Sequence, residues 1–170
     1  MEIEISKEEE QRYSELQEIA LNFAREGNMQ ELEKMLRAGI NVNLSTHRED
    51  SLLMLASYNG NYETTKMLIE NNADLNKINA REQTPLEGVC FKGDLKIVKL
   101  LVENGANFEG KAIVYASMFG NKDIVEYLKS KGLAKKSLQI FGINIEWIAS
   151  ITTYIKSLKN KKLMRKSYTQ

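Results

Sequence analysis

The chain has 170 residues, of which 42% are hydrophobic and 28% are charged, and its formal net charge is +1. This length suits one domain, and the apolar fraction is ample for an ordered core. A single cysteine excludes an internal disulfide framework, and one proline without any Gly/Ser-rich stretch gives no sign of a flexible linker between domains.

The amino-terminal residues 1–14 are acidic and lack the basic start and apolar run of a secretory signal. We therefore expect the protein in the cytoplasm, although delivery to a host cell by a specialised secretion system would leave no mark in the sequence. From Glu8 to Phe23, apolar residues recur at helical spacing opposite a polar face. This pattern predicts a helical cap at the amino-terminal end that continues into the next element.

Glycines divide the following hundred residues into similar units. A glycine followed by Asn or Asp recurs at intervals of 33, 33 and 27 residues, and a second glycine, once an asparagine, follows each after twelve residues. The first glycine is expected to end a helix at positive φ, the Asn or Asp to cap the next helix with its side-chain oxygen, and the second glycine to end that helix. The pairs are Gly27 with Gly39, Gly60 with Asn72, Gly93 with Gly105 and Gly120 with Gly132.

Within each pair lies an amphipathic segment of about ten residues with apolar residues at helical spacing. A shorter, more apolar segment precedes each first glycine, as in residues 51–58 and 112–117. Two helices of this size cannot bury an apolar face alone, so the pairs must stack on one another. Leu68, Leu101 and Leu128 should then be interior.

Residues within these units resemble the ankyrin repeat family. Thr84-Pro85-Leu86 matches the opening of the family's motif, with Glu87 where histidine is usual, and Ala73-Asp74-Leu75-Asn76 matches its close. The resemblance covers about residues 15–136. It implies an all-α fold, an α-solenoid of four stacked helix-turn-helix repeats with helical caps at both ends. The implied units are an acidic segment and start of a cap at 1–14, repeats at 15–43, 44–76, 77–109 and 110–136, and a capping helix with a basic tail at 137–170.

The sequence departs from the family's pattern in its hairpins. Glu49 and Glu82 stand where the family has the turn glycine, and about six residues are missing between repeats three and four. We therefore expect the third hairpin, near Gly110, to be a tight turn.

The carboxyl-terminal residues 137–170 allow more than one interpretation. Residues 1–128 have a charge balance of −8, whereas residues 129–170 have a balance of +9, so an elongated stack should have an acidic end and a basic end. Apolar residues from Ile140 to Leu158 recur at steps of three and four, which favours a capping helix; residues 138–155 could also span a membrane or lie at its surface. The basic residues between 156 and 166 could instead attach the chain to a membrane or to nucleic acid.

No catalytic constellation emerges from the sequence. The single histidine, His47, falls at a predicted hairpin tip, and Cys90 occupies a position where a small buried side chain lets helices approach. Ligand spacings for zinc or calcium and a phosphate-binding glycine loop are missing. We therefore expect a chain that is not an enzyme and needs no cofactor or metal.

The family resemblance implies recognition of a protein partner on the concave face, formed by hairpin tips and the shorter helices. The expected function is a non-catalytic protein–protein interaction module, an adaptor or regulator that acts as a monomer. Alternatives are an inhibitor or immunity-type neutraliser of an enzyme or toxin, a secreted bacterial effector that uses the same face, or electrostatic attachment through the tail. Tyr58, Phe91 and Met118 could instead pack on the neighbouring hairpins or on one another, which would seal the edge without a partner. The expected contact residues are Arg25, His47, Arg48, Asp50, Tyr58, Asn59, Arg81, Gln83, Phe91, Lys92, Met118 and Phe119.

Overall fold

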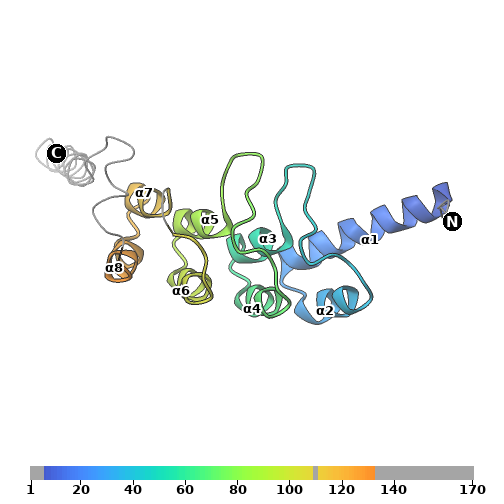
Figure 1. The fold of residues 1–170 in the computed structure, drawn as a ribbon, viewed down its shortest axis with the longest axis horizontal. Coiled ribbons are helices and arrows are strands. Elements are labelled where there is room, and N and C mark those ends of the chain that lie inside the picture. Colours follow the sequence, from blue (N-terminus) through green and yellow to red (C-terminus); the bar gives the residue numbers. More distant parts are fainter. Residues whose placement is uncertain (1–5, 109–110, 133–170) are drawn as a thin grey trace, which may run out of the picture.

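The computed structural model describes residues 6–108 and 111–132, which form a row of antiparallel helix pairs (Figure 1). These residues contain eight helices and no strand, so the predicted solenoid of helix pairs is confirmed. One layer consists of α1 (Lys7–Glu26), α3 (Leu52–Tyr58), α5 (Pro85–Lys92) and α7 (Ala112–Met118). The second layer consists of α2 (Met29–Arg37), α4 (Tyr62–Glu70), α6 (Leu95–Glu103) and α8 (Lys122–Ser130).

The core runs along the stack between the two layers. Each helix of the first layer packs on the next helix of that layer. Each helix of the second layer packs on the first-layer helix that precedes it in the chain and on the adjacent helices of its own layer. Leu68, Leu101 and Leu128 are fully buried, as expected for apolar residues one repeat apart. Because each pair shares its apolar face with the next pair, the packing order follows the chain order.

The turn signals of the sequence behave as predicted in backbone conformation. The four glycines that end the helices α1, α3, α5 and α7 have φ between 77° and 90°, and Asn72, which replaces the second glycine in one repeat, has φ 61°. Asparagine tolerates the left-handed region best after glycine, which explains the substitution.

The Asn or Asp after each of these four glycines was predicted to cap the next helix with its side-chain oxygen, and this was wrong in three of the four repeats. Only Asp94 accepts a hydrogen bond from its own helix, from Ile97 N at 3.1 Å. Asn61 Nδ2 instead donates to the carbonyl oxygens of Ala24 (3.0 Å) and Arg25 (2.8 Å) at the end of α1. Asn121 makes the equivalent contact with the end of α5, and Asn28 makes no side-chain cap either. An amide has a donor that a carboxylate lacks, and it satisfies carbonyls that a helix end leaves free.

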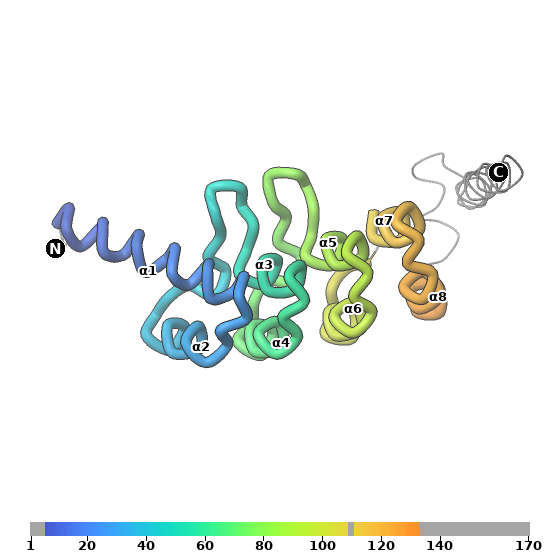
Figure 2. Tube along the Cα trace, turned by 180° about the vertical axis from the view of Figure 1, so that it is seen from behind, coloured from blue at the N-terminus to red at the C-terminus, as the bar shows by residue number. Residues whose placement is uncertain are grey.

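Helix α1 is much longer than the other helices of its layer. Ser6 caps its amino-terminal end: the Ser6 side chain accepts from Glu9 N while the Glu9 carboxylate accepts from Ser6 N. Its carboxyl-terminal half covers the end of the stack through buried Ala20 and Ala24. Its amino-terminal half extends past the stack, as Figures 1 and 2 show from opposite sides. The helix therefore runs unbroken across the repeat boundary expected at residue 15.

Two hairpins project from the junctions between the layers, from the α2–α3 connection and from the α4–α5 connection (Figure 1). Glu49 and Glu82, at their turns, have φ of 63° and 54°, the conformation that glycine adopts without strain. The tight turn predicted near Gly110 lies outside the described residues, and so do the capping helix and basic tail predicted for 137–170. Within 6–108 and 111–132, no helix has the length and apolar character needed to cross a membrane.

Candidate functional site

A groove of about 320 Å³ lies on the first layer, between the ends of α1, α3 and α5 and the two hairpins. Seven of the twelve residues expected to contact a partner line it. They are Arg25, Asp50, Tyr58, Asn59, Arg81, Gln83 and Phe91, and the remaining lining residues are Met54, Leu55, Thr84 and Gly88. Residues from five separate elements therefore converge on one concavity.

A row of three aromatic rings forms the apolar wall of this face. The ring centroids of Tyr58 and Phe91 are 6.3 Å apart with the planes at 15°, and those of Phe91 and Phe119 are 4.2 Å apart at 62°. The three side chains are nevertheless 38%, 37% and 51% exposed. The rings therefore hold one another in place and still present apolar surface to a partner.

The continuation of this row differs from the expected ladder. We expected Met118 to follow Phe91, but Phe119, the residue after α7 ends, contacts Phe91 instead. Met118 is 55% exposed and lies outside the aromatic row. The ring of Phe119 makes an edge-on aromatic contact with the ring of Phe91, and Met118 has no ring with which to make it.

The polar rim of the groove is built around Asn79, which the sequence analysis did not single out. Its side chain is 2% exposed, and its Oδ1 accepts from the backbone N–H groups of Arg81 (3.0 Å) and Gln83 (3.1 Å). Its Nδ2 donates to Asp50 Oδ1 (2.6 Å) and contacts Met54 Sδ (3.3 Å). One asparagine thus shapes the second hairpin and ties it to the first hairpin and to α3.

A signal for Asn79 does exist in the sequence. Thr46 lies 33 residues earlier, and its Oγ1 accepts from the backbone N–H groups of Arg48 and Asp50, both at 3.2 Å. Short polar side chains that bond to the backbone two and four residues later are typical of such turns. The backbone also joins the hairpins directly, since Ala80 N donates to Arg48 O at 3.0 Å.

The charged groups of the groove are paired but remain accessible. Arg25 contacts Glu18 at 3.3 Å and also donates to Asn22, whereas Arg81 lies 3.8 Å from Asp50. The side chain of Arg81 is 71% exposed, so water screens this pair strongly.

The floor of the groove depends on a glycine inside a helix. At Gly88 of α5, an added Cβ would lie 3.3 Å from Cδ2 of the Tyr58 ring. The absent side chain lets the ring lie close to α5 and leaves room beside it. Glycine inside a helix lowers stability by about 1 kcal/mol relative to alanine. The close approach of the Tyr58 ring to α5 gives a structural reason for glycine at this position.

The other expected contact residues lie around the groove. His47 and Arg48 are exposed at the tip of the first hairpin. The ammonium of Lys92 lies 5.0 Å from the centroid of the Tyr58 ring. Both residues line a second hollow, formed by residues 57–60 and 92–96. Met118 and Phe119 extend the face toward α7. The structure therefore gathers the central residues and places the rest along the edge.

Neither of the two groups considered for catalysis, Cys90 and His47, lines the groove. Burial, and secondarily the nearby Glu87 carboxylate, raises the pKa of the Cys90 thiol to about 12, so the thiol stays neutral and weakly nucleophilic. His47 is exposed at its hairpin tip. Among residues 6–108 and 111–132, no three His, Cys, Asp or Glu side chains are grouped so as to hold a metal ion.

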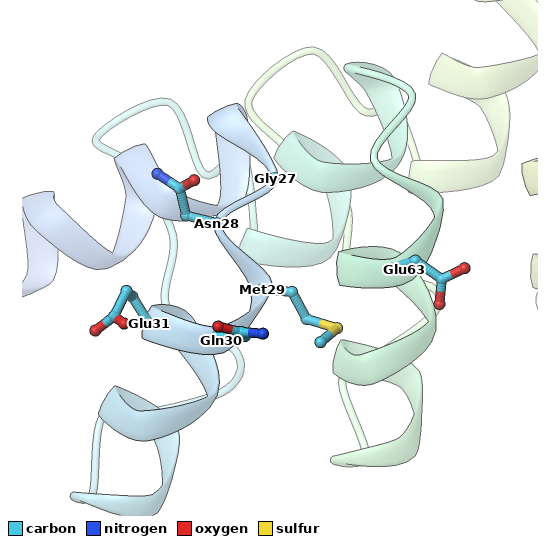
Figure 3. A pocket seen from close by; sticks show the side chains of 6 residues that line it. All are labelled: Gly27, Asn28, Met29, Gln30, Glu31 and Glu63. Atoms are coloured by element: carbon cyan, nitrogen blue, oxygen red, sulfur yellow. The ribbon is translucent and has the colours of Figure 1, made fainter.

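A third hollow, of about 340 Å³, lies at the turn between α1 and α2 (Figure 3). The side chains of Asn28, Glu31 and Glu63 point away from one another around it, so they do not converge on a ligand. The groove on the first layer is therefore the better candidate site.

Comparison with known proteins agrees with this architecture. The family model described as ankyrin repeats in three copies matches residues 20–111 and, again, residues 53–140. A Pseudomonas aeruginosa PAO1 protein named as an ankyrin repeat protein, PA3287, is 56% identical over 39 residues, which are 23% of each chain. The crystal structure of the human ASB11 ankyrin repeat domain matches with a TM-score of 0.63 and 28% identity, over 67% of this chain and 54% of that chain. The chain thus spans about half of this solved neighbour, and the match covers under a quarter of the curated relative.

Proposed function

The chain belongs to the ankyrin repeat family, and from this premise we propose that it binds a protein partner in the groove between α1, α3, α5 and the two hairpins. Ankyrin repeats are in general non-catalytic interaction modules, and the groove is the place where this chain offers converging side chains. The single observation that carries the proposal is the row of Tyr58, Phe91 and Phe119, which are ordered by mutual contact yet at least 37% exposed.

The physical argument concerns the free energy lost when side chains are immobilised on binding. Each long side chain that becomes fixed costs about 0.5–1.5 kcal/mol, which reduces affinity. Here Phe91 already contacts a ring on each side, so less of this cost remains. Tyrosine and arginine are enriched among residues that dominate binding energy, and Tyr58, Arg25 and Arg81 lie in the same groove.

The hairpins support the same conclusion. The hydrogen bonds of Asn79 and the Ala80–Arg48 backbone bond fix the rim relative to α3. A fixed rim lets the polar groups of Arg81 and Gln83 provide orientation while the rings provide apolar contact. An adaptor, an inhibitor of an enzyme or toxin, and a secreted effector would all use this surface, so the test is made on the surface itself.

The experiment is site-specific photo-crosslinking in the cells from which the chain comes. The photoreactive residue benzoylphenylalanine replaces Phe91 in the groove or, as a control, Tyr62 on α4. Phe91 is 37% exposed and Tyr62 is 38% exposed, so the second layer offers a matched aromatic position. We expect one protein to be crosslinked from position 91 and not from position 62.

Two outcomes decide the result. A crosslinked protein that the unlabelled wild-type chain displaces from position 91, and that mass spectrometry identifies, supports the groove as the binding surface. Crosslinking to the same protein from position 62 with equal yield, or from position 62 alone, contradicts it.

A further inference from the structure

The amino-terminal half of α1 is a feature that the groove does not use. Helix α1 has 20 residues, whereas α3, α5 and α7 have seven or eight. About twelve residues, Lys7 to Glu18, therefore extend roughly 18 Å beyond the length of the other helices at 1.5 Å per residue. We call this part, together with Ile19, the α1 extension. Figures 1 and 2 show it leaving the stack at the end opposite α8.

The α1 extension carries an exposed apolar stripe. Tyr13, Leu16 and Ile19 recur every three residues along one side and are 48%, 46% and 43% exposed. The stripe leads into Ala20, which is fully buried against the stack. An apolar stripe continuous with the core, but outside it, is typical of a face that a further helix or segment covers.

The charge around this stripe restricts what can cover it. Between Lys7 and Ile19 the helix has five glutamates and two basic residues, a balance of −3, and all of these side chains are exposed. The Glu9 carboxylate is fixed by hydrogen bonds from Ser6, which lower its pKa and keep it ionised. Two such extensions would repel each other if they paired, so the stripe favours a basic occupant.

The chain itself contains a segment of that chemistry. Residues 129–170 have ten Lys and Arg and one Glu, and the basic residues concentrate between 156 and 166. Apolar residues from Ile140 to Leu158 precede and meet them at steps of three and four. This sequence has apolar residues for the stripe and positive charges for the glutamates.

We propose that the α1 extension of one copy binds residues 137–166 of a second copy. The extension and α8, the last described helix, lie at opposite ends of the stack. Each copy therefore offers one acceptor surface and, from its other end, one donor segment. Contacts between two different surfaces do not close on themselves as a two-fold dimer does, so copies add head to tail.

The test is sedimentation equilibrium of the full chain over a wide concentration range. At low salt, the weight-average mass should rise above the monomer mass of 19.4 kDa and continue to rise with concentration. Raising the ionic strength to about 1 M shortens the screening length to about 3 Å and should weaken association by on the order of tenfold or more. A chain that stays monomeric at every concentration in low salt overturns the proposal.

Two full-length variants make the direction of assembly visible. The acceptor variant carries Leu16→Lys with Ile19→Lys, and the donor variant carries Lys161→Glu, Lys162→Glu and Arg165→Glu. Each variant alone should remain monomeric, because each lacks one of the two surfaces. Mixed in equal amounts, they should form one species of twice the monomer mass that grows no further, since each supplies the surface the other has lost.

A matched control removes an exposed apolar residue elsewhere. Ile78 is 54% exposed on the second hairpin, so Ile78→Lys should leave both the melting temperature and the self-association unchanged. Self-association that persists in the donor variant shows pairing of α1 extensions and refutes the proposal. A mixture of the two variants that remains monomeric refutes it as well.

Discussion

Replacing Gly93 with alanine tests how consecutive repeats are joined. Gly93 ends α5 with φ 90°, and an added Cβ would lie 2.7 Å from Asn121 Oδ1 and 3.0 Å from Asn121 Cγ. Asn121 is held there because its Nδ2 donates to Cys90 O at 2.8 Å. The alanine would therefore introduce backbone strain and displace a side chain that satisfies the end of α5.

The magnitude follows from comparison with Gly60. Its φ is 81°, but the nearest atom to an added Cβ is Asp94 Oδ2 at 4.0 Å, because the Asp94 side chain caps its own helix. Gly60→Ala should lower the free energy of unfolding by about 1–2 kcal/mol, the cost of left-handed backbone. Gly93→Ala adds the loss of one hydrogen bond, about 1 kcal/mol, for a total of about 2–3 kcal/mol.

The assay is urea unfolding followed by circular dichroism, with Gly60→Ala as the matched control. A double-mutant cycle isolates the contact, because in the Asn121→Ala background Gly93→Ala should lose its extra cost and match Gly60→Ala. Equal losses for the two glycines in the wild-type background would refute the reasoning, as would an extra cost for Gly93→Ala that survives in the Asn121→Ala background.

Three further changes probe the hairpins and the core. Glu49→Gly should raise the free energy of unfolding by about 0.5–1 kcal/mol, measured by urea unfolding, because it relieves a φ of 63°; Glu49→Ala should bring no such gain. Asn79→Ala should lower the free energy of unfolding by about 2–3 kcal/mol, because two backbone N–H groups and Asp50 lose their buried partner; a loss below 0.5 kcal/mol would contradict the structural role of Asn79. The Cys90 thiol should react with a thiol reagent only as fast as the chain unfolds. Because its pKa rises from 9.0 to about 12 on folding, stability relative to Cys90→Ala should be constant below pH 9 and fall as the pH rises from 9 toward 12; equal pH dependence of the two proteins would count against a buried thiol.

Local backbone rules explain what the sequence predicted well. Helix ends at Gly60 and Gly93 are specified by one residue type and its conformation, so spacing alone located them, and the buried position of Leu101 follows from helical periodicity. The role of Asn61 was not accessible in the same way. Its amide can donate or accept, and the choice depends on carbonyls 36 and 37 residues earlier in the chain.

The groove shows the same division between local and long-range effects. The repeat register placed Tyr58 and Phe91 on one face, and the structure brings both into the groove. The register also favoured Met118 as the next residue, whereas Phe119 contacts Phe91, because ring geometry between repeats decides that contact. The spacing of 33 residues from Thr46 could have pointed to the turn role of Asn79, but its bond to Asp50 links two hairpins and could not be read from the turn alone.

The most direct test of the account is a binding titration with the protein identified by crosslinking. The wild-type chain is compared with the double variant Tyr58→Ala and Phe91→Ala, and with the control Tyr62→Ala and Ile78→Ala, which removes exposed apolar side chains outside the groove. If the groove binds the partner, the first pair should weaken binding by about 30-fold or more, as expected when about 2 kcal/mol of contact energy is lost. The control should bind within about twofold of wild type. Wild-type affinity in the groove variant, with the fold intact by circular dichroism, would contradict the account.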